Sequence, residues 1–192
     1  LKTLPQRQWM SGMSEVYKHA LIGDAEYWSF IADIDLKNED ALSTLLHQSI
    51  SIKNNIVLQD WDEKGLRKML NFGHTVGHAI ESQALEKGRD LLHGEAIAIG
   101  MLIETILSQM TNGLEKDVSE SIQSRIQDFF SLAPIDEGEF EELIAWMRHD
   151  KKNDQSEINF TLLKDIGVAE INKVCSIDDI QYAIKTYNSA LL

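Results

Sequence analysis

The chain has 192 residues, a length typical of one domain, and its 43% of hydrophobic residues are enough to build a buried core. Its 31 acidic residues outnumber the 18 basic ones and give a net charge of −13, which argues against a nucleic-acid partner because so acidic a surface repels phosphate backbones. The longest apolar run, AIAIGMLI, is too short to cross a membrane, so we expect no membrane partner.

Helical periodicity dominates the first third of the chain. A first helix is predicted over about 11–21, ending near Gly23, and a second over about 25–34. Asn38 has the residue type of an N-cap for a long third helix, which the acidic segment DWDEKG (60–65) ends. The apolar stripe predicted for this third helix consists of Leu42, Leu46, Ile50 and Ile56.

Two histidine-bearing helices follow. The fourth helix carries His74 and His78 and is expected to end near Lys87–Gly88. The fifth begins at His93 and is apolar nearly all round as far as Ile106. A helix without a polar face is buried on all sides, so we expect this one at the centre of the fold.

The last third of the chain mixes helices with a hairpin. Helices are predicted over about 117–130 and 138–147, and SIDDIQYAIKTYN predicts a capped final helix. Before it, EINFTLL and VAEINKV have β-type residues on either side of KDIG, which indicates a hairpin. The only cysteine, Cys175, excludes an internal disulfide, reads as a small buried hydrophobe and favours a reducing, cytoplasmic location.

Three of the six histidines lie close together, in LNFGHTVGHAIES and LLHGEAIAIGM. Imidazoles among apolar residues lose solvation unless something satisfies them, and a divalent metal does this well. His74 and His78 are four residues apart and therefore share one helical face. The motif HTVGH lacks the glutamate of HExxH, so the general base of a zinc protease is missing. A metal or substrate site and a pair of core histidines are equally consistent with this pair alone.

His93 strengthens the metal interpretation if the chain can return it to His74. A helix from His74 to about Leu85 extends roughly 17 Å. The segment from Glu86 to Leu92 spans at most about 23 Å when extended. The return is therefore feasible only if this segment is nearly straight.

A carboxylate is the natural third metal ligand, and Glu15, Glu81 and Glu95 compete for that role on the residues alone. Any single glutamate is more often a solvated helix residue. Basic residues near the histidines would suit an anionic substrate, although each alone is more typical of a surface residue. These candidates are Lys18, Lys53, Arg67, Lys151 and Lys152. Neither GxGxxG nor GxxxxGK[ST] occurs, so the chain has no recognisable nucleotide-binding loop of its own.

Several stretches between about Leu4 and Val174 together resemble the helical C-terminal domain of the 3-dehydroquinate synthase family. They are SGMSEVYKHALIGD, DWDEKGLRKMLNFGHTVGHAIE, LLHGEAIAIGM, MRHDKKN and NFTLLKDIGVAEI. The resemblance implies a mainly α, multi-helix domain of the dehydroquinate synthase-like fold with a short β-hairpin near the C-terminus. It also implies that residues 1–192 form a single metal- and substrate-binding domain without the family's N-terminal NAD-binding domain.

The family's reaction converts 3-deoxy-arabino-heptulosonate 7-phosphate, an anionic sugar phosphate, to 3-dehydroquinate and phosphate in the shikimate pathway, using NAD and zinc or cobalt. By resemblance, the metal ligands are Glu15, His74 and His93, and His78 is a substrate or proton-transfer contact. The substrate contacts implied are Lys18, Lys53, Arg67, Asn71 and one of Lys151 and Lys152, with Lys152 preferred. Asp60 is expected to orient neighbouring cations. Homodimers are common in the family, so a homodimer is one oligomeric state to test. The chain alone is expected to be inactive.

Three alternatives remain open on the sequence. A related sugar-phosphate cyclase would share the architecture, although LNFGH with Asn71 resembles dehydroquinate synthase more. A helical zinc hydrolase would use the same histidines but leaves the basic residues unexplained. A non-catalytic helical module would keep the histidines in its core.

Overall fold

A computed structural model describes residues 3–32, 34–150 and 157–191, except the side chains of 149, 150 and 157. Its helices are α1 (Gln6–Gly23), α2 (Ala25–Ala32), α3 (Glu39–Gln59), the 3-10 helix η1 (Leu66–Asn71), α4 (His74–Glu86), α5 (His93–Thr111), α6 (Lys116–Phe129), the 3-10 turn η2 (Glu137–Glu139), α7 (Phe140–Asp150) and α8 (Ile177–Ala190). Strands β1 (Glu157–Asp165) and β2 (Val168–Ser176) pair antiparallel between α7 and α8. This confirms a mainly α fold with a C-terminal hairpin. Across the described part of the chain, no helix has the length and apolarity needed to span a membrane.

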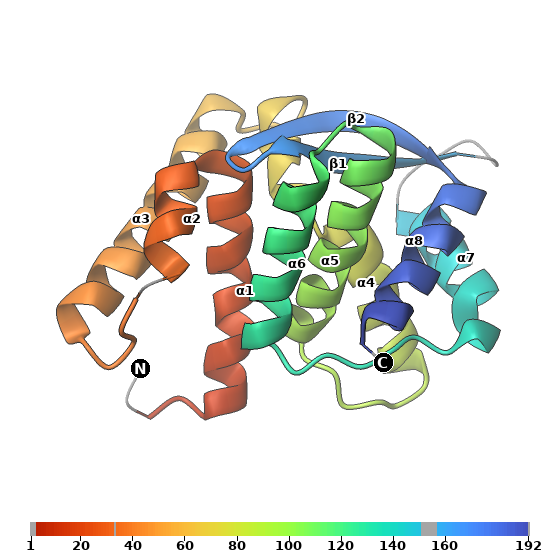
Figure 1. The fold of residues 1–192 in the computed structure, drawn as a ribbon, viewed down its shortest axis with the longest axis horizontal. Helices are drawn as coiled ribbons and strands as arrows, with labels where there is room; N and C mark the ends of the chain where they lie inside the picture. Colours follow the sequence, from red (N-terminus) through yellow and green to blue (C-terminus); the bar gives the residue numbers. More distant parts are fainter. Residues whose placement is uncertain (1–2, 33, 151–156, 192) are drawn as a thin grey trace.

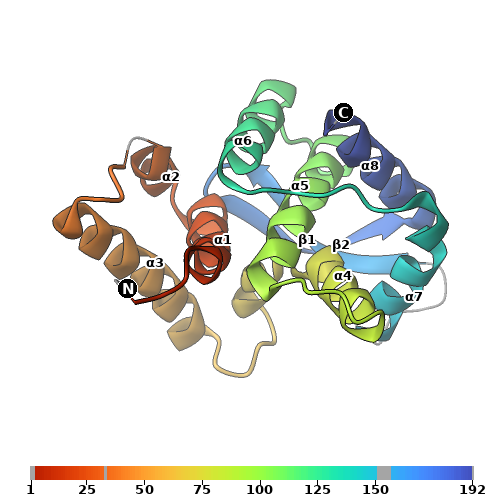
Figure 2. The ribbon, with the colours of Figure 1, turned by 90° about the horizontal axis from the view of Figure 1, so that it is seen from below.

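Helix α5 is the centre of the fold. Every residue of α5 from Ala96 to Ser108 is buried, which confirms the prediction from its uniformly apolar sequence. It contacts α1, α4, α6, α8 and β1. Figures 1 and 2 show these helices grouped around α5, with the hairpin lying across one end of the group. The helix continues to Thr111, five residues beyond Ile106, where the predicted apolar run ends, because nothing in the sequence between breaks it.

Two glycines of α5 let neighbouring backbones approach it closely. A Cβ atom at Gly94 would lie 1.9 Å from the carbonyl oxygen of Ser11 on α1. A Cβ atom at Gly100 would lie 2.0 Å from the carbonyl oxygen of Gly73, just before α4. Only glycine fits at such contacts, so α5 sets how near α1 and the start of α4 can come.

The third helix confirms its predicted cap but only part of its predicted stripe. The Asn38 side chain accepts hydrogen bonds from the amides of Asp40 and Ala41. Ile50 was expected to be buried, yet 65% of it is exposed. A stripe with a constant spacing of four drifts about 40° per step around a helix, so its third member leaves the contact line. The line actually buried is Leu45, Ser49 and Ile56.

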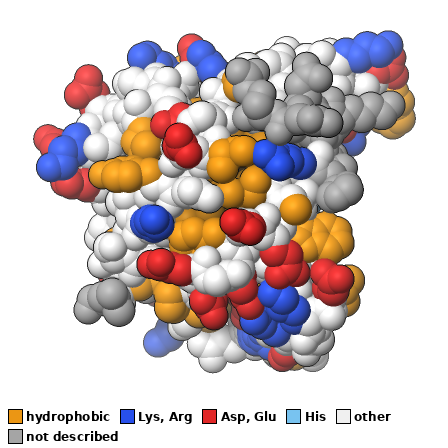
Figure 3. Space-filling model, turned by 90° about the vertical axis from the view of Figure 1, so that its right-hand side faces the viewer, with side chains coloured by type: hydrophobic (Ala, Val, Ile, Leu, Met, Phe, Trp, Pro, Cys, Tyr) orange, Lys and Arg blue, Asp and Glu red, His pale blue; other side chains and the backbone are white. Residues whose placement is uncertain are grey.

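The remaining elements lie close to their predicted positions. The first helix begins earlier than expected, at Gln6, because Pro5 stands at its N-cap and cannot continue a helix toward the N-terminus. The final helix has a capping box formed by Ser176 and Asp179. On the side where α7 and α8 lie, Figure 3 shows acidic and basic side chains interspersed with apolar atoms.

Candidate metal centre and substrate pocket

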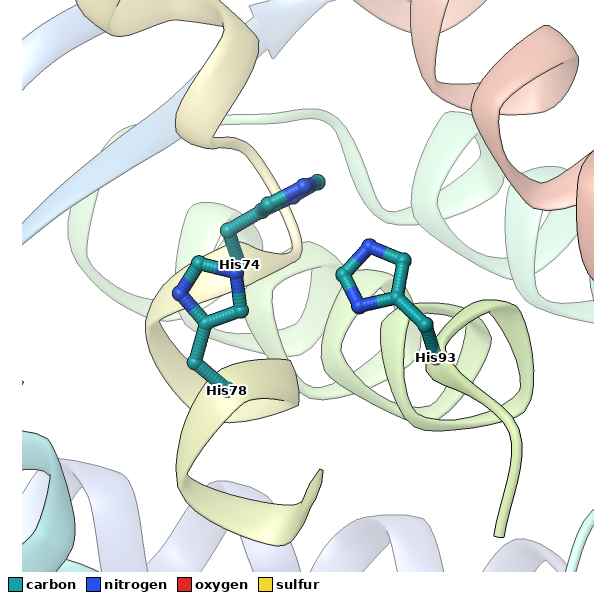
Figure 4. A group of neighbouring side chains, drawn as sticks. All are labelled: His74, His78 and His93. Atoms are coloured by element: carbon teal, nitrogen blue, oxygen red, sulfur yellow. The ribbon is translucent and has the colours of Figure 1, made fainter. Parts of the chain in front are cut away.

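Three imidazoles from two helices meet at one point. His74 begins α4, His78 follows one turn later, and His93 begins α5. The ring centroids are 5.0 Å apart for His74 and His78, 5.6 Å for His74 and His93, and 5.8 Å for His78 and His93. Each ring offers one nitrogen that lies within 4.8 Å of the others, and Figure 4 shows the three rings clustered between the two helices. The structure thus confirms that His93 returns to His74.

The segment that returns His93 is not straight, contrary to expectation. Gly88 has a φ of 63°, and the amides of Gly88 and Arg89 donate to carbonyl oxygens of the last turn of α4. The distance that the segment from Glu86 to Leu92 must cover is shorter than assumed. His93 meets α4 one to two turns after His74, where its Nδ1 lies 2.9 Å from Glu81 Oε2. The His74 and His93 side chains then bridge the remaining gap.

The hydrogen bonds of two histidines orient their Nε2 atoms for metal binding. His74 Nδ1 lies 3.2 Å from the carbonyl oxygen of Phe72, and His93 Nδ1 lies 2.9 Å from Glu81 Oε2. Both oxygens only accept hydrogen bonds, so in the neutral rings Nδ1 carries the hydrogen and Nε2 keeps its lone pair. Metal-binding histidines are commonly held in this way by a carbonyl or a carboxylate.

Glu15 of α1 supplies a carboxylate beside these rings. Its Oε1 is buried, has no hydrogen-bond partner among the described residues, and lies 3.6 Å from His74 Nε2. A buried carboxylate oxygen facing an imidazole lone pair is unfavourable unless a cation lies between them. Bonds near 2 Å place two ligands of one ion about 3–4 Å apart, so the observed separation fits a divalent cation.

The competing glutamates have other partners. Glu95 accepts two hydrogen bonds from Arg7, at 2.6 and 2.7 Å. Glu81 accepts from His93 and therefore holds that ring in place. Among the described residues, the remaining candidates for a third ligand beside His74 are thus Glu15 and the third histidine, His78.

The predicted substrate contacts converge beside His74. A cavity of about 180 Å³ draws its walls from α1, α3, η1 and the start of α4. Its lining residues are Glu15, Lys18, Lys53, Glu63, Arg67, Leu70, Asn71 and His74. The structure therefore brings together Lys18, Lys53, Arg67 and Asn71, which are up to 53 residues apart in sequence. Lys151 and Lys152 lie outside the described residues.

Burial and a close ion pair determine the charges of this pocket. Burial lowers the pKa of Lys18, and the carboxylate of Glu15, 2.8 Å from Nζ, opposes that effect. Burial raises the pKa of Glu15, but Lys18 outweighs this and holds it below its usual value. Burial, reinforced by the charge of Lys18, lowers the pKa of His74 to about 3. His74 is therefore neutral near pH 7, the form that binds metal.

Glu63 is a pocket residue that the sequence interpretation missed. Its Oε2 lies 3.6 Å from Arg67 Nε, and its Oε1 accepts a hydrogen bond of 3.4 Å from Asn71. Its spacing of four before Arg67 is the only signal that pointed to it. Asp60 was expected to orient neighbouring cations, and it holds two of them through their backbone. Its carboxylate accepts hydrogen bonds from the amides of Lys64, Gly65 and Arg67, and these bonds hold its pKa below the usual value.

Comparison with known proteins identifies the family of this chain. A family model described as 3-dehydroquinate synthase C-terminal matches residues 12–153. The chain belongs to this family. Relatives named 3-dehydroquinate synthase occur in Parabacteroides distasonis (37% identity over 99% of this chain and 54% of the relative), Bacillus cereus (34%, 100% and 53%) and Leptospira interrogans (36%, 96% and 51%). The chain spans about half the length of these curated relatives.

Two solved structures share the fold of this family member. One is 2-epi-5-epi-valiolone synthase from Streptomyces hygroscopicus with NAD+ and Zn2+ bound, with a TM-score of 0.81, 23% identity, and coverage of 98% of this chain and 53% of that one. The other is 2-deoxy-scyllo-inosose synthase complexed with carbaglucose-6-phosphate, NAD+ and Co2+, with a TM-score of 0.74, 24% identity, and coverage of 97% and 54%. At these identities the likeness establishes the fold.

Proposed function

We propose that this chain is the metal- and substrate-binding part of a 3-dehydroquinate synthase, with residues 1–192 acting as one domain. The whole enzyme would convert 3-deoxy-arabino-heptulosonate 7-phosphate to 3-dehydroquinate and phosphate. The observation that carries the proposal is the buried Glu15 Oε1 facing His74 Nε2 at the edge of a cavity lined by cations. A zinc hydrolase would need a general base beside HTVGH, and it gives no role to that set of cations.

In this proposal Glu15, His74 and His93 hold a divalent metal, zinc or cobalt. Such an ion acts as a Lewis acid and favours loss of a proton from a coordinated hydroxyl group. The neutral His74 and the ionised Glu15 are in the protonation states that ligation requires. The Zn2+ and Co2+ in the two related cyclases support this choice of metal.

The cations of the cavity would bind the anionic groups of the substrate. Arg67 donates from Nη1 to the carbonyl oxygen of Trp61, which holds the guanidinium beside the cavity. Its planar fork suits a phosphate or carboxylate, while Lys18 and Lys53 add point charges. Asn71 would bind a hydroxyl group, and His78 would exchange a proton with the substrate. Lys152 keeps its proposed substrate role as a prediction.

The cofactor and the assembly extend the proposal beyond this chain. The sequence has no glycine-rich nucleotide loop, so we propose that NAD is bound mainly by another part of the enzyme. Cys175 is buried and forms no disulfide, which supports a cytoplasmic location. A homodimer is proposed as the assembly, and sedimentation of the intact enzyme would test it.

Zinc binding tests the metal centre. The wild-type chain is expected to take up one zinc ion in equilibrium dialysis, and His74→Ala and His93→Ala are each expected to lose it. Circular dichroism should show that both variants keep the helical content of the wild type. If both histidine variants retained zinc at wild-type affinity, the assignment would be wrong.

Arg67→Ala tests the substrate pocket separately. It should keep zinc but weaken binding of the heptulosonate phosphate by about 10–100-fold, because charge-assisted hydrogen bonds contribute about 1.5–3 kcal/mol. Arg89→Ala is the matched control, since Arg89 pairs with Glu139 beside a different cavity. Calorimetric titration of the zinc-loaded protein would measure both. Equal losses in the two variants would argue against the pocket.

A further inference from the structure

A buried acidic residue connects the two helices that carry the histidines. Glu104 lies on α5, about three turns after His93, and is 0% exposed. Its Oε2 accepts a hydrogen bond of 2.6 Å from the amide of Gly73, and its Oε1 accepts one of 3.1 Å from the amide of Val76. A carboxylate of one helix thus caps the N-terminus of the other.

Helix α4 needs this external cap. The first amides of a helix have no partner within the helix, and an N-cap side chain usually accepts from one of them. Here the N-cap is Gly73, which has no side chain and a φ of 78°. A Cβ atom at Gly73 would lie 2.6 Å from the Met101 side chain and 3.2 Å from the carbonyl oxygen of Ile97. Packing against α5 therefore excludes an ordinary capping residue, and Glu104 takes over its function with a charge that suits the positive end of the helix dipole.

The two amides that Glu104 binds lie on either side of His74 in sequence. The backbone of His74 is therefore held by a residue of α5, the helix whose first residue is His93. We propose that Glu104 is a positioning residue for the metal centre, which sets the place of His74 relative to His93 without contacting metal or substrate. This inference rests on the metal site of the proposed function.

An apolar side chain at position 104 would remove this cap. A buried carboxylate is unfavourable in itself, and its hydrogen bonds to the two amides help to stabilise it there.

The variant Glu104→Gln tests the inference. A glutamine has nearly the same shape, but only its oxygen can accept, so one of the two amides loses its partner. We expect the zinc dissociation constant, measured by chelator competition, to rise about tenfold, as for the loss of outer contacts to metal ligands. The amides of Gly73 and Val76 should also exchange their hydrogens faster. Thr105→Val is the matched control, because Thr105 is equally buried on α5 and donates only to Met101 of its own helix.

The outcomes separate a positioning role from a purely structural one. A structural role would lower the melting temperature of Glu104→Gln and leave the zinc affinity of the folded protein unchanged, and that result would overturn the inference. An equal loss of affinity in Thr105→Val would overturn it too. If Glu104→Gln does not fold, Glu104→Asp keeps the charge but is one methylene shorter, and it should weaken zinc binding in the same direction.

One further measurement needs no variant. Adding zinc to the wild-type chain should shift the amide resonances of Gly73 and Val76, and unshifted resonances would contradict the inference. A wild-type chain that takes up no zinc would remove the proposed metal centre itself. Unchanged affinity in the folded Glu104 variants would remove only the role of Glu104.

Discussion

At the scale of single residues, the neighbours of each titratable group decide what it can do. His74 and His93 each begin a helix, yet a backbone carbonyl orients one and a carboxylate orients the other. A buried histidine, His19, lies one turn after Glu15, and its Nδ1 is 2.7 Å from Ser49 Oγ. Its Nε2 lies 3.8 Å from Glu15 Oε2. The carboxylate of Glu15 is thus surrounded by Lys18, His19 and His74, which makes it the most heavily constrained acid of the pocket.

The third metal ligand can be identified by comparing two variants. Glu15→Gln should lower zinc affinity by about 100-fold or more, because losing a ligand exceeds the 10–100-fold effect of losing an outer contact. His78→Ala should lower it by less than about tenfold if His78 contacts only substrate. Chelator competition at pH 7 would measure both. The reverse order of effects would make His78 the third ligand in place of Glu15.

The pH dependence of stability follows from the buried histidines. Burial lowers the pKa of His19 from 6.5 to about 4. Between these values the unfolded chain binds more protons than the folded one, so stability is greatest above pH 6.5 and is lost as the pH falls toward 4. The loss from His19 is on the order of 3 kcal/mol. Urea unfolding of the metal-free chain between pH 4 and 7 would measure it.

A pair of variants attributes this pH dependence to its source. His19→Gln should flatten the curve, although His74 adds a fall of the same sign because burial lowers its pKa to about 3. His47→Gln is the control, since His47 is exposed on α3. Identical curves for wild type and His19→Gln would rule out His19 as a source.

At the scale of elements, the site depends on how closely α4 and α5 approach each other. The backbone of Gly100 packs against Gly73, and the cap from Glu104 follows one turn later. The hairpin adds a second support at this end, because Thr161 of β1 donates to the carbonyl oxygen of Lys68 in η1. The histidines are therefore placed by packing between helices and not by their own hydrogen bonds alone.

Adding a methyl group at this contact should separate the helices. Gly100→Ala places a Cβ atom 2.0 Å from the carbonyl oxygen of Gly73, which is backbone and cannot rotate away. We expect a loss of about 1–3 kcal/mol in the free energy of unfolding, as for other overpacked cores. Gly12→Ala on α1 meets nothing within 4 Å and should instead stabilise the chain by about 0.5–1 kcal/mol. Denaturant midpoints that moved in the same direction would contradict this account.

At the scale of the whole molecule, the pocket collects its residues from four segments that only the complete helical domain brings together. Lys18 comes from α1, Lys53 from α3, Arg67 and Asn71 from η1, and His74 from α4. The chain nevertheless spans about half the length of its curated relatives. The proposed reaction needs a hydride carrier, and no nucleotide motif lies within the sequence given.

The isolated chain is therefore expected to bind metal and substrate without turnover. Supplied with zinc, NAD and the heptulosonate phosphate, it should release no phosphate above background in a colorimetric assay. A full-length enzyme containing the same 192 residues should release phosphate under the same conditions. Turnover by the isolated chain would show that the hydride carrier binds within these residues.

Sequence patterns that span only a few residues were enough to predict the helices and the hairpin. The Asn38 cap, the uniformly apolar run after His93 and the Ser176–Asp179 capping box are local, and the structure has each of them in place. The resemblance to the family, and with it the mainly α fold, was also predicted from short sequence motifs. The spacing of His74 and His78 needed no more than the pitch of a helix.

Tertiary structure decided everything that depends on distances between remote residues. Composition and spacing did not distinguish Glu15 from Glu81 or Glu95, the family resemblance alone favoured it, and only packing placed its oxygen 3.6 Å from His74. The same holds for Glu104, whose apolar neighbours in α5 hide its contact with α4, 28 to 31 residues away. Helix caps and periodicity are encoded within one or two turns, whereas these contacts arise from how closely helices pack, and that depends on all the side chains and glycines between them at once.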